Sequence, residues 1–297
     1  MTDKLKIKKF SSNDVSLKEI GDEAFYKCKS LSNINLESVE TFGTSSFEEC
    51  RFLDNINLKN AVNIKARAFK DCAGMQNIGE FQREVRIENH AFYGDINLLR
   101  VKLEKIIELG EYSFYNCTIM SAAGKFNDAV KEIPKSCFSG CSYIGELDFN
   151  NVEILHEWSF ANSTRLKITN TKKLRKIDRA ALLNACKDEI ETFDTNSLEE
   201  IGEDGCGFMN VKKLNLKNLK KIDRGAFRSS SLEEVEDFEK SAIKEIPENC
   251  FAFAWKLRSI NLSNVESIKQ RAFVENEKLE NVDLSKVKKL GSEAFIK

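Results

Sequence analysis

The amino-acid sequence predicts a repeat solenoid, in which short structural units stack in register and share one continuous core. Three observations predict this fold. A phenylalanine recurs at intervals of 21 to 24 residues along the chain. The same kinds of small and aliphatic residues stand at fixed distances after each phenylalanine. Between them, short segments alternate apolar and polar residues, which is typical of a strand with one buried face.

The recurring phenylalanine closes a short motif, which reads Ile-Gly-Asp-Glu-Ala-Phe at residues 20–25 and Ile-Lys-Ala-Arg-Ala-Phe at residues 64–69. Leu182 and Cys206 stand where a phenylalanine is expected, and with them the chain has 13 such anchors. One unit alone cannot bury its apolar residues, whereas stacked units bury them all, so we expect the anchors to form a ladder in the core. The anchor phenylalanines are Phe25, Phe47, Phe69, Phe92, Phe114, Phe138, Phe160, Phe227, Phe251, Phe273 and Phe295.

Each unit continues in the same way after its anchor. Three residues later stands a small or sulfur-bearing residue, such as Cys28 or Ser163, and three residues further an aliphatic one, such as Leu31. A second apolar pair spaced by three, Val39 and Phe42 in the first unit, closes the unit and marks a second short strand. The first strand of each unit is expected parallel to its neighbours, at residues 34–36, 56–58, 101–103, 147–149, 214–216, 260–262 and 282–284.

The cysteines follow the repeat. Nine is an odd number, which argues against a complete disulfide framework. Cys28, Cys50 and Cys72 are 22 residues apart, so neighbouring thiols could approach disulfide distance in principle. We interpret them instead as a reduced ladder of small, buried side chains. A zinc site needs four converging ligands, and no paired Cys-x-x-Cys motif supports one, so we expect no metal.

Composition and charge exclude several classes of protein. The 297 residues contain 46 Lys and Arg against 47 Asp and Glu, so no overall positive field points to nucleic acid. The first ten residues carry charges where a signal peptide needs an apolar stretch. No run approaches the roughly 18 apolar residues of a membrane span. We therefore expect no nucleic-acid partner and no membrane span, and see no export signal.

Residue-level evidence for catalysis is missing from the sequence. His90 and His156 are the only histidines, and both stand at variable positions of the repeat, where an exposed turn residue is expected. The spacing does not support a triad of histidine, nucleophile and acid, and no phosphate-binding loop motif occurs. An enzyme with a pocket near Trp158 or Trp255 has no motif behind it. We expect no enzyme and no cofactor.

Two columns of charged residues stand just before the apolar residue of the second strand. One contains Glu153, Arg175, Glu199 and Lys220, and opposite signs mostly alternate along it. Stacked at strand spacing, such residues pair across coils and help to set the register. The alternation also removes the uninterrupted basic stripe that nucleic-acid binding would need.

The remaining candidate for function is the polar position inside the predicted strands. Polar groups on rigid neighbouring strands can hold a partner without a large ordering cost, although a face satisfied by water alone is as plausible for any single residue. A flanking column contains Asn33, Asn55, Asn77, Arg100, Glu146, Lys213, Glu234 and Asn281. The candidate partner-binding residues are Asn35, Asn57, Lys102, Asp148, Thr169, Asn215, Glu236, Asn261 and Asp283.

The pattern I-G-x-x-A-F-x-x-C-x-x-L-x-x-I-x-L-x-x-V-x-x-I resembles the BspA-type leucine-rich repeat family, most clearly at residues 20–58, 64–78 and 246–295. The resemblance implies a right-handed α/β superhelix of about 12 to 13 repeats, with short parallel strands on its inner face and turns or short helices elsewhere. It also implies a surface or secreted protein of the adhesion and recognition type. We expect one solenoid domain over residues 1–297, irregular at 120–126 and 184–210.

The last unit ends one residue short of its expected cysteine position, and no polar cap follows it. We expect the chain to be a fragment of a longer protein, or another surface to cover this end by association.

Two hypotheses about function follow. The first is a non-catalytic scaffold that binds a protein, cell-surface or extracellular-matrix partner through the inner strand face. The alternative is an intracellular structural or assembly scaffold, which the unpaired cysteines and the missing signal peptide favour. Localisation and thiol titration distinguish the two.

Overall fold

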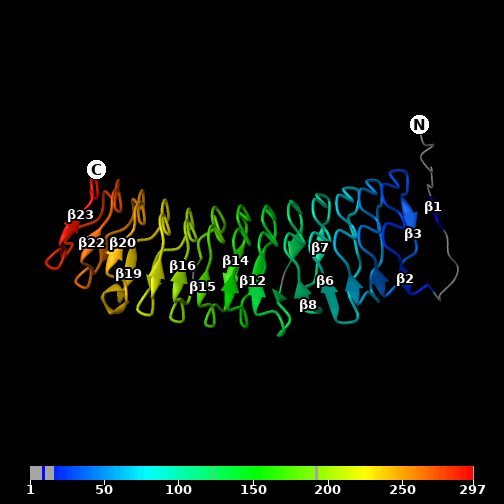
Figure 1. Cartoon of the computed structure of the whole chain (residues 1–297), viewed down its shortest axis with the longest axis horizontal. Helices are drawn as coiled ribbons and strands as arrows, with labels where there is room; N and C mark the ends of the chain where they lie inside the picture. The colour runs from blue at the N-terminus through cyan, green and yellow to red at the C-terminus, as the bar shows by residue number, and fades with distance from the viewer. Residues whose placement is uncertain (1–8, 11–16, 123, 191–192, 297) are drawn as a thin grey trace. The chain divides into compact units, whose positions relative to one another are not determined.

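The computed structural model describes residues 9–10, 17–122, 124–190 and 193–296. The chain is a parallel β-solenoid of about 12 turns with almost no helix (Figure 1). The solenoid predicted from the sequence is thus confirmed. Short helices were an expected alternative to turns, but the described part of the chain contains only the 3-10 helix η1, Phe238–Lys240.

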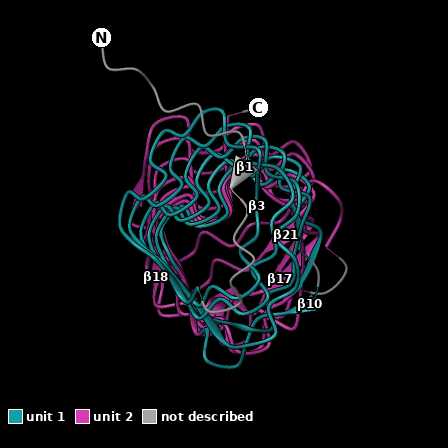
Figure 2. Cartoon of the chain, turned by 90° about the vertical axis from the view of Figure 1, so that its right-hand side faces the viewer, with its two compact units in different colours: residues 1–130, 134–147 teal, residues 131–133, 148–297 magenta. Residues whose placement is uncertain are grey.

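The chain divides into two compact units (Figure 2). Unit 1 contains residues 1–130 and 134–147, and unit 2 contains residues 131–133 and 148–297. Each unit is described by itself below, and the single domain expected over residues 1–297 stays a prediction.

Unit 1 has two strands in most of its coils. One set of strands pairs in parallel in the order β2-β4-β5-β6-β8, and β1-β3 and β7-β9 pair likewise. The β6–β8 pair contains a register shift at Val85 and Arg86. The strands are β1 (Lys9–Phe10), β2 (Glu19–Ile20), β3 (Asn33–Ile34), β4 (Thr41–Phe42), β5 (Asn63–Ile64), β6 (Val85–Ile87), β7 (Arg100–Val101), β8 (Ile106–Leu109), β9 (Ser121–Ala122) and β10 (Gly124–Lys125).

Unit 2 repeats this arrangement. Parallel sheets run in the orders β11-β13-β15-β16-β18, β17-β19-β21 and β20-β22-β23. Its strands are β11 (Glu132–Ile133), β13 (Ile154–Leu155), β14 (Lys167–Thr169), β15 (Lys176–Ile177), β16 (Glu200–Ile201), β17 (Lys213–Asn215), β18 (Lys221–Ile222), β19 (Glu234–Glu236), β20 (Glu245–Ile246), β21 (Ser259–Ile260), β22 (Ser267–Ile268) and β23 (Lys289–Leu290), while β12 (Glu146–Asp148) has residues in both units.

Two strand faces result. In unit 2, β18 lies on one side of the coils, and β17 and β21 lie on the opposite side (Figure 2). Within each unit, we call the strands that follow an anchor the inner strand face: β3, β7 and β9 in unit 1, β14, β17, β19 and β21 in unit 2, and β12. The strands that precede an anchor form the second strand face of each unit: the sheet β2-β4-β5-β6-β8 in unit 1, and the sheets β11-β13-β15-β16-β18 and β20-β22-β23 in unit 2.

The anchor phenylalanines form the predicted ladder in each unit. In unit 1, ring centroids from Phe25 to Phe138 follow one another at 4.9 to 5.5 Å, with planes within 9° of parallel. In unit 2, the rings of Phe227, Phe251, Phe273 and Phe295 stack at 5.0 to 5.3 Å. Leu182 and Cys206 are buried and donate the same inter-coil hydrogen bond as the phenylalanines, to Gly205 and Ala226. They therefore fill the anchor position with a smaller side chain.

The cysteine column packs as a reduced ladder. All nine cysteines lie in the described part of the chain and none is in a disulfide. The thiols of Cys50 and Cys72 each donate a hydrogen bond of 3.0 Å to the backbone oxygen of the anchor in the preceding coil, Phe25 and Phe47. Buried polar groups need such partners, so the small side chain and its weak donor both fit the position.

The segment around each anchor is a chain of turns because its backbone alternates in handedness. Ser45 and Glu49, four residues apart, have φ of 53° and 60°. Their N–H groups donate to Ala66 and Lys70 of the next coil, as Phe47 donates to Ala68. Residues with left-handed backbone angles interrupt an α-helix. They also direct every second backbone N–H of this segment toward the next coil. Hydrogen bonds that a helix would form internally are thus used between coils, which explains why helices do not form here.

The two stretches expected to be irregular lie only partly in the described chain. Within residues 120–126, β9 and β10 stand on either side of residue 123, which lies outside the described residues. Within residues 184–210, residues 191–192 lie outside them, and Ile190 forms an isolated parallel bridge with Val211. In the described residues of this coil, the bridge takes the place of a regular inner strand before β16.

Candidate functional site

Seven of the nine candidate partner-binding residues stand at or directly after the end of an inner strand, next to a buried strand residue. Asn57 follows the buried Ile56 and Asp283 follows the half-buried Val282, at places where the structure has no strand. Asn35, Asn261 and Asp283 are exposed, and the others are half-buried. The residues that end a strand are Asp148, Thr169, Asn215 and Glu236.

Most of these side chains bond to their own backbone. In six of them, a side-chain oxygen accepts a hydrogen bond from the N–H two residues further along, which closes an Asx turn. In Asp283, the Ser285 N–H also lowers the pKa of the carboxyl group, because this bond favours the ionised form. The six acceptors are Asn35, Asn57, Asp148, Asn215, Asn261 and Asp283, at 2.8 to 3.2 Å.

The structure brings some candidates together in unit 2. Asn215 and Glu236 are register partners in the β17–β19 pair. Asn261 and Asp283 line one shallow hollow of about 620 Å³, together with Arg258 and Glu280. The Asp148 carboxylate accepts a hydrogen bond of 2.9 Å from the Asn170 amide of the next coil.

In unit 1 the candidates are more separate. The Asn35 oxygen accepts from the Glu37 N–H, and the Asn57 amide donates to the Glu37 carboxylate at 3.3 Å. These two candidates therefore share one acidic neighbour. Lys102 stands elsewhere and forms an ion pair of 2.8 Å with Glu80.

The flanking column is the more exposed one. Strands β3, β7, β9 and β21 each present an exposed residue followed by a buried one, and β12, β14 and β17 begin in the same way. The Asn77 amide donates to the Asn55 oxygen at 2.7 Å. Lys213 pairs with Glu234 and Glu236 at 3.2 and 2.6 Å. This column, rather than the turn-forming one, supplies most of the polar surface of the inner strand face.

Charges on the second strand face pair across coils. Arg175 bonds Glu153 at 3.3 Å and Lys220 bonds Glu199 at 2.9 Å. Such exposed pairs contribute about 0–1 kcal/mol each. The alternating charges therefore set register on this face, as the sequence indicates.

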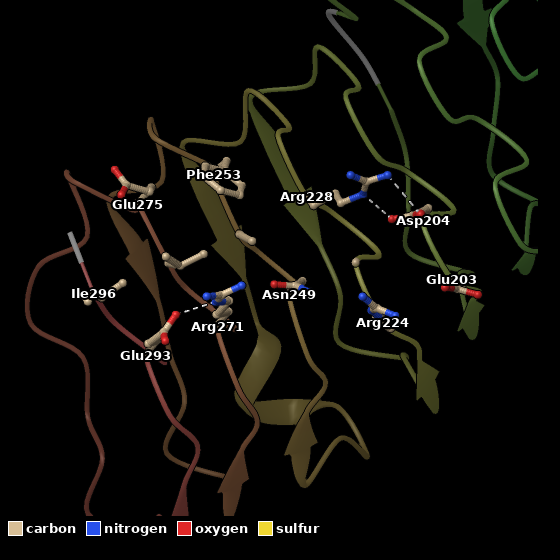
Figure 3. Close-up of a pocket in the computed structure, with 13 residues that line it drawn as sticks. Glu203, Asp204, Arg224, Arg228, Asn249, Phe253, Arg271, Glu275, Glu293 and Ile296 are labelled. Atoms are coloured by element: carbon tan, nitrogen blue, oxygen red, sulfur yellow. Dashed lines mark hydrogen bonds and ion pairs between the residues drawn. The ribbon is translucent and has the colours of Figure 1, made fainter.

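A hollow of about 670 Å³ on the turns of unit 2 was not predicted (Figure 3). Its lining includes the small residues Gly225 and Ala252. The ion pairs Arg228–Asp204 and Arg271–Glu293 stand at its two ends, and Phe253 forms part of its rim (Figure 3). Gly225 and Ala252 stand at different positions relative to their anchors, so the repeat pattern gives no signal for this hollow. Its charges are largely paired with one another, so the hollow has no strong preference for cations or anions.

The two histidines lie on turns, as expected, but each has specific partners. His156 is half-exposed, and its Nε2 and Nδ1 contact the carboxylates of Glu132 at 2.7 Å and Asp178 at 3.3 Å. Both ring nitrogens are thus engaged, which leaves neither to activate a nucleophile.

His90 belongs to an aromatic cluster that the sequence analysis missed. Its ring stacks on Tyr112 at 4.8 Å, and Tyr93 stacks on Tyr115 at 4.9 Å. Burial, with Lys70 and Arg67 nearby, lowers the pKa of His90. The cluster stabilises the turns of unit 1 with a neutral imidazole.

Among the described residues, no group of three or more His, Cys, Asp or Glu side chains is placed to hold a metal ion. No helix in the same part of the chain is long and apolar enough to span a membrane.

Comparison with known proteins agrees with this architecture. The chain is similar in fold to a leucine-rich repeat protein from Bacteroides ovatus ATCC 8483, with a TM-score of 0.61 and 18% identity, over 93% of this chain and 80% of that one. It is also similar to a leucine rich cell surface protein from Faecalibacterium prausnitzii A2-165, with a TM-score of 0.41 and 17% identity, over 93% and 83%. No curated protein matches the chain. The family model described as BspA type leucine rich repeat region matches residues 2–85, 62–189 and 186–297. The chain therefore belongs to the BspA-type leucine-rich repeat family.

Proposed function

We propose that the protein is a non-catalytic scaffold that binds a protein or cell-surface partner through the inner strand face. The observation that carries this proposal is the flanking column, in which inner strands of each unit present exposed polar side chains on a backbone that parallel pairing holds in register. Binding then requires little ordering of the scaffold, because coil-to-coil hydrogen bonds already hold these positions.

Two charge swaps in unit 1 test the face. The double variant Lys102→Glu with Glu80→Lys reverses charges on the inner strand face and keeps the 2.8 Å ion pair. The matched control, Arg86→Glu with Glu108→Arg, does the same on the second strand face, where the pair is 3.3 Å. Both variants preserve net charge. We expect only the first to weaken capture of the partner from cell-surface and cytosolic fractions, at unchanged thermal stability. Equal capture by both variants would count against the inner strand face.

An intracellular assembly scaffold is the second candidate, and the unpaired cysteines favour it. Eight of the nine cysteines are buried and one is half-buried, all as free thiols. Reducing conditions keep such thiols free. Nine titratable thiols in protein purified from its native cell, together with a cytosolic location, would support this candidate over a surface protein.

A further inference from the structure

At the repeat position three residues after the anchor, one coil has a carboxylic acid where the other coils have neutral side chains. At the position three residues after the anchor, the polar side chains are almost all neutral donors. The thiols of Cys50, Cys72, Cys117 and Cys141 donate to the backbone oxygen of the anchor one coil before, at 3.0 to 3.1 Å. Asn276 has an amide there, whose oxygen accepts from the Ala254 N–H at 3.1 Å. Asp95 takes this position between Cys72 and Cys117.

Asp95 is fully buried, with 0% of its surface exposed. Neither carboxyl oxygen meets the geometry of a full hydrogen bond, although the Cys72 backbone N–H lies close enough to act on the carboxyl group. The titratable groups that face it are Cys72 and Asp71 in the preceding coil and Cys117 in the following one. The cation beside Asp71, Lys70, lies 3.0 Å from the Glu48 carboxylate and 3.6 Å from the Asp71 carboxylate, so it is already paired with two other acids. A carboxylate in this place would be an unpaired buried charge, which is strongly unfavourable.

We propose that Asp95 is a buried proton-binding site of unit 1, neutral in the folded chain, whose hydroxyl donates to the backbone oxygen of Phe69. Phe69 is the anchor of the preceding coil, the acceptor that the thiol column assigns to this position. The protonated carboxyl group then donates to the anchor oxygen of the preceding coil, as the thiols of Cys72 and Cys117 do in the neighbouring coils. Burial, followed by the negative charge of Asp71, raises the pKa of the Asp95 carboxyl well above its ordinary 3.8, whereas the Cys72 backbone N–H acts against this.

Loss of this proton weakens the coil around residues 92–99. The same coil exposes Ile96 and Leu99, the residues that follow Asp95 on the surface. Opening of the coil therefore changes an apolar part of the surface of unit 1. Asp95 makes this coil a pH-sensitive element.

The sign of the pH dependence follows from the raised pKa. The folded chain holds a proton that the unfolded chain releases above about pH 3.8, so the contribution to stability is complete below that value. It is lost as the pH rises toward the pKa of the folded chain. Over this interval the folding equilibrium constant falls about tenfold per pH unit for one proton.

The experiment compares the full chain with Asp95→Asn, which keeps a donor and cannot ionise. Asp95→Cys restores the thiol of the column, and Glu111→Gln removes an exposed carboxyl of the same unit as the control. Urea unfolding of unit 1 is measured from pH 4 to pH 9. We expect wild type and Glu111→Gln to lose stability with rising pH relative to Asp95→Asn and Asp95→Cys, with the difference closing toward pH 4.

Infrared spectroscopy gives an independent readout. At neutral pH the wild-type chain should show the carbonyl band of a protonated carboxylic acid, and both Asp95 variants should lack it. If Asp95→Asn does not fold, Asp95→Cys makes the same comparison. Parallel pH profiles in wild type and the folded Asp95 variant, or no protonated-acid band in wild type, would overturn the proposal.

Discussion

Single cysteines differ in this protein by how far the solenoid buries them. Cys28 is half-buried, whereas Cys50, Cys137 and Cys206 are buried, and burial raises the pKa of each of these three thiols to about 12. Because the thiolate is the reactive species, buried thiols of this kind are inert toward alkylation. The alkylation rate of each cysteine therefore reports how well the stacked coils bury its thiol.

We expect iodoacetamide to label Cys28 first in the native chain at pH 8, and the other cysteines only after urea unfolding. Mass spectrometry of labelled peptides measures the order. Since unfolded thiols ionise near 9.0 and the folded ones well above it, stability should also fall as the pH rises beyond 9. If Cys50 or Cys206 were labelled as fast as Cys28 in the native chain, their thiols would not be buried as the structure describes.

Residue patterns identified the core but not the role of individual polar residues. Phe47 and Cys72 were placed correctly because a solenoid buries whatever recurs at one position. The repeat pattern does not single out Asp95, because it describes this column only by its small and sulfur-bearing residues. Asn57 and Asp148 were predicted to face a partner, but an alternating pattern gives the direction of a side chain, not its bond to the next turn.

At the scale of one strand and its turn, the Asx residues decide how the chain leaves the inner strand face. The Asp148 oxygens accept from the Asn150 N–H at 2.8 Å and from the Asn170 amide at 2.9 Å. Without the Asp148 carboxylate, the Asn150 N–H and the Asn170 amide can form hydrogen bonds only with water.

We expect Asp148→Ala to lower the free energy of unfolding by about 1–2 kcal/mol, because it removes two hydrogen bonds at a partly exposed turn. Asp148→Asn, which keeps an acceptor oxygen, should lose less than half of that amount. Urea denaturation measures both. If wild type and Asp148→Ala had the same free energy of unfolding, the turn would form without the Asp148 side chain. Asp148 would then be a surface residue with no effect on stability.

The turn segments show what an apolar repeat pattern leaves open at this scale. The pattern around Phe47 was compatible with a short helix or with turns. The outcome depends on where the N–H groups find acceptors, and Ser45 and Glu49 use the carbonyls of the next coil instead of their own. The turn conformation depends on acceptors in a neighbouring coil, so the helix propensity of the segment alone does not predict it.

At the scale of the molecule, the regularity of the anchors should set local stability. In unit 2, the rings from Phe227 to Phe295 stack without a gap, whereas Leu182 and Cys206 replace two consecutive rings. Smaller anchors bury less apolar area per coil.

We expect hydrogen exchange to be faster at residues 184–190 and 193–210 than at residues 227–273, by about tenfold or more, which corresponds to roughly 1.4 kcal/mol of local stability. Both stretches belong to unit 2, so each serves as the reference for the other. Exchange measured by mass spectrometry that is equal in the two stretches would mean that strand pairing, not ring stacking, limits local opening.

The hydrogen bonds that pass from each turn to the following coil have an evolutionary consequence. Each coil donates backbone N–H groups to the following coil and offers carbonyl groups to the preceding one, as Phe25, Phe47 and Phe69 donate to Ser46, Ala68 and Ala91. A gene duplication that inserts a whole unit therefore adds a coil whose two neighbours already fit it. Chains of this kind can lengthen or shorten by complete units without inventing a new interface, while a partial insertion would misalign every column that follows.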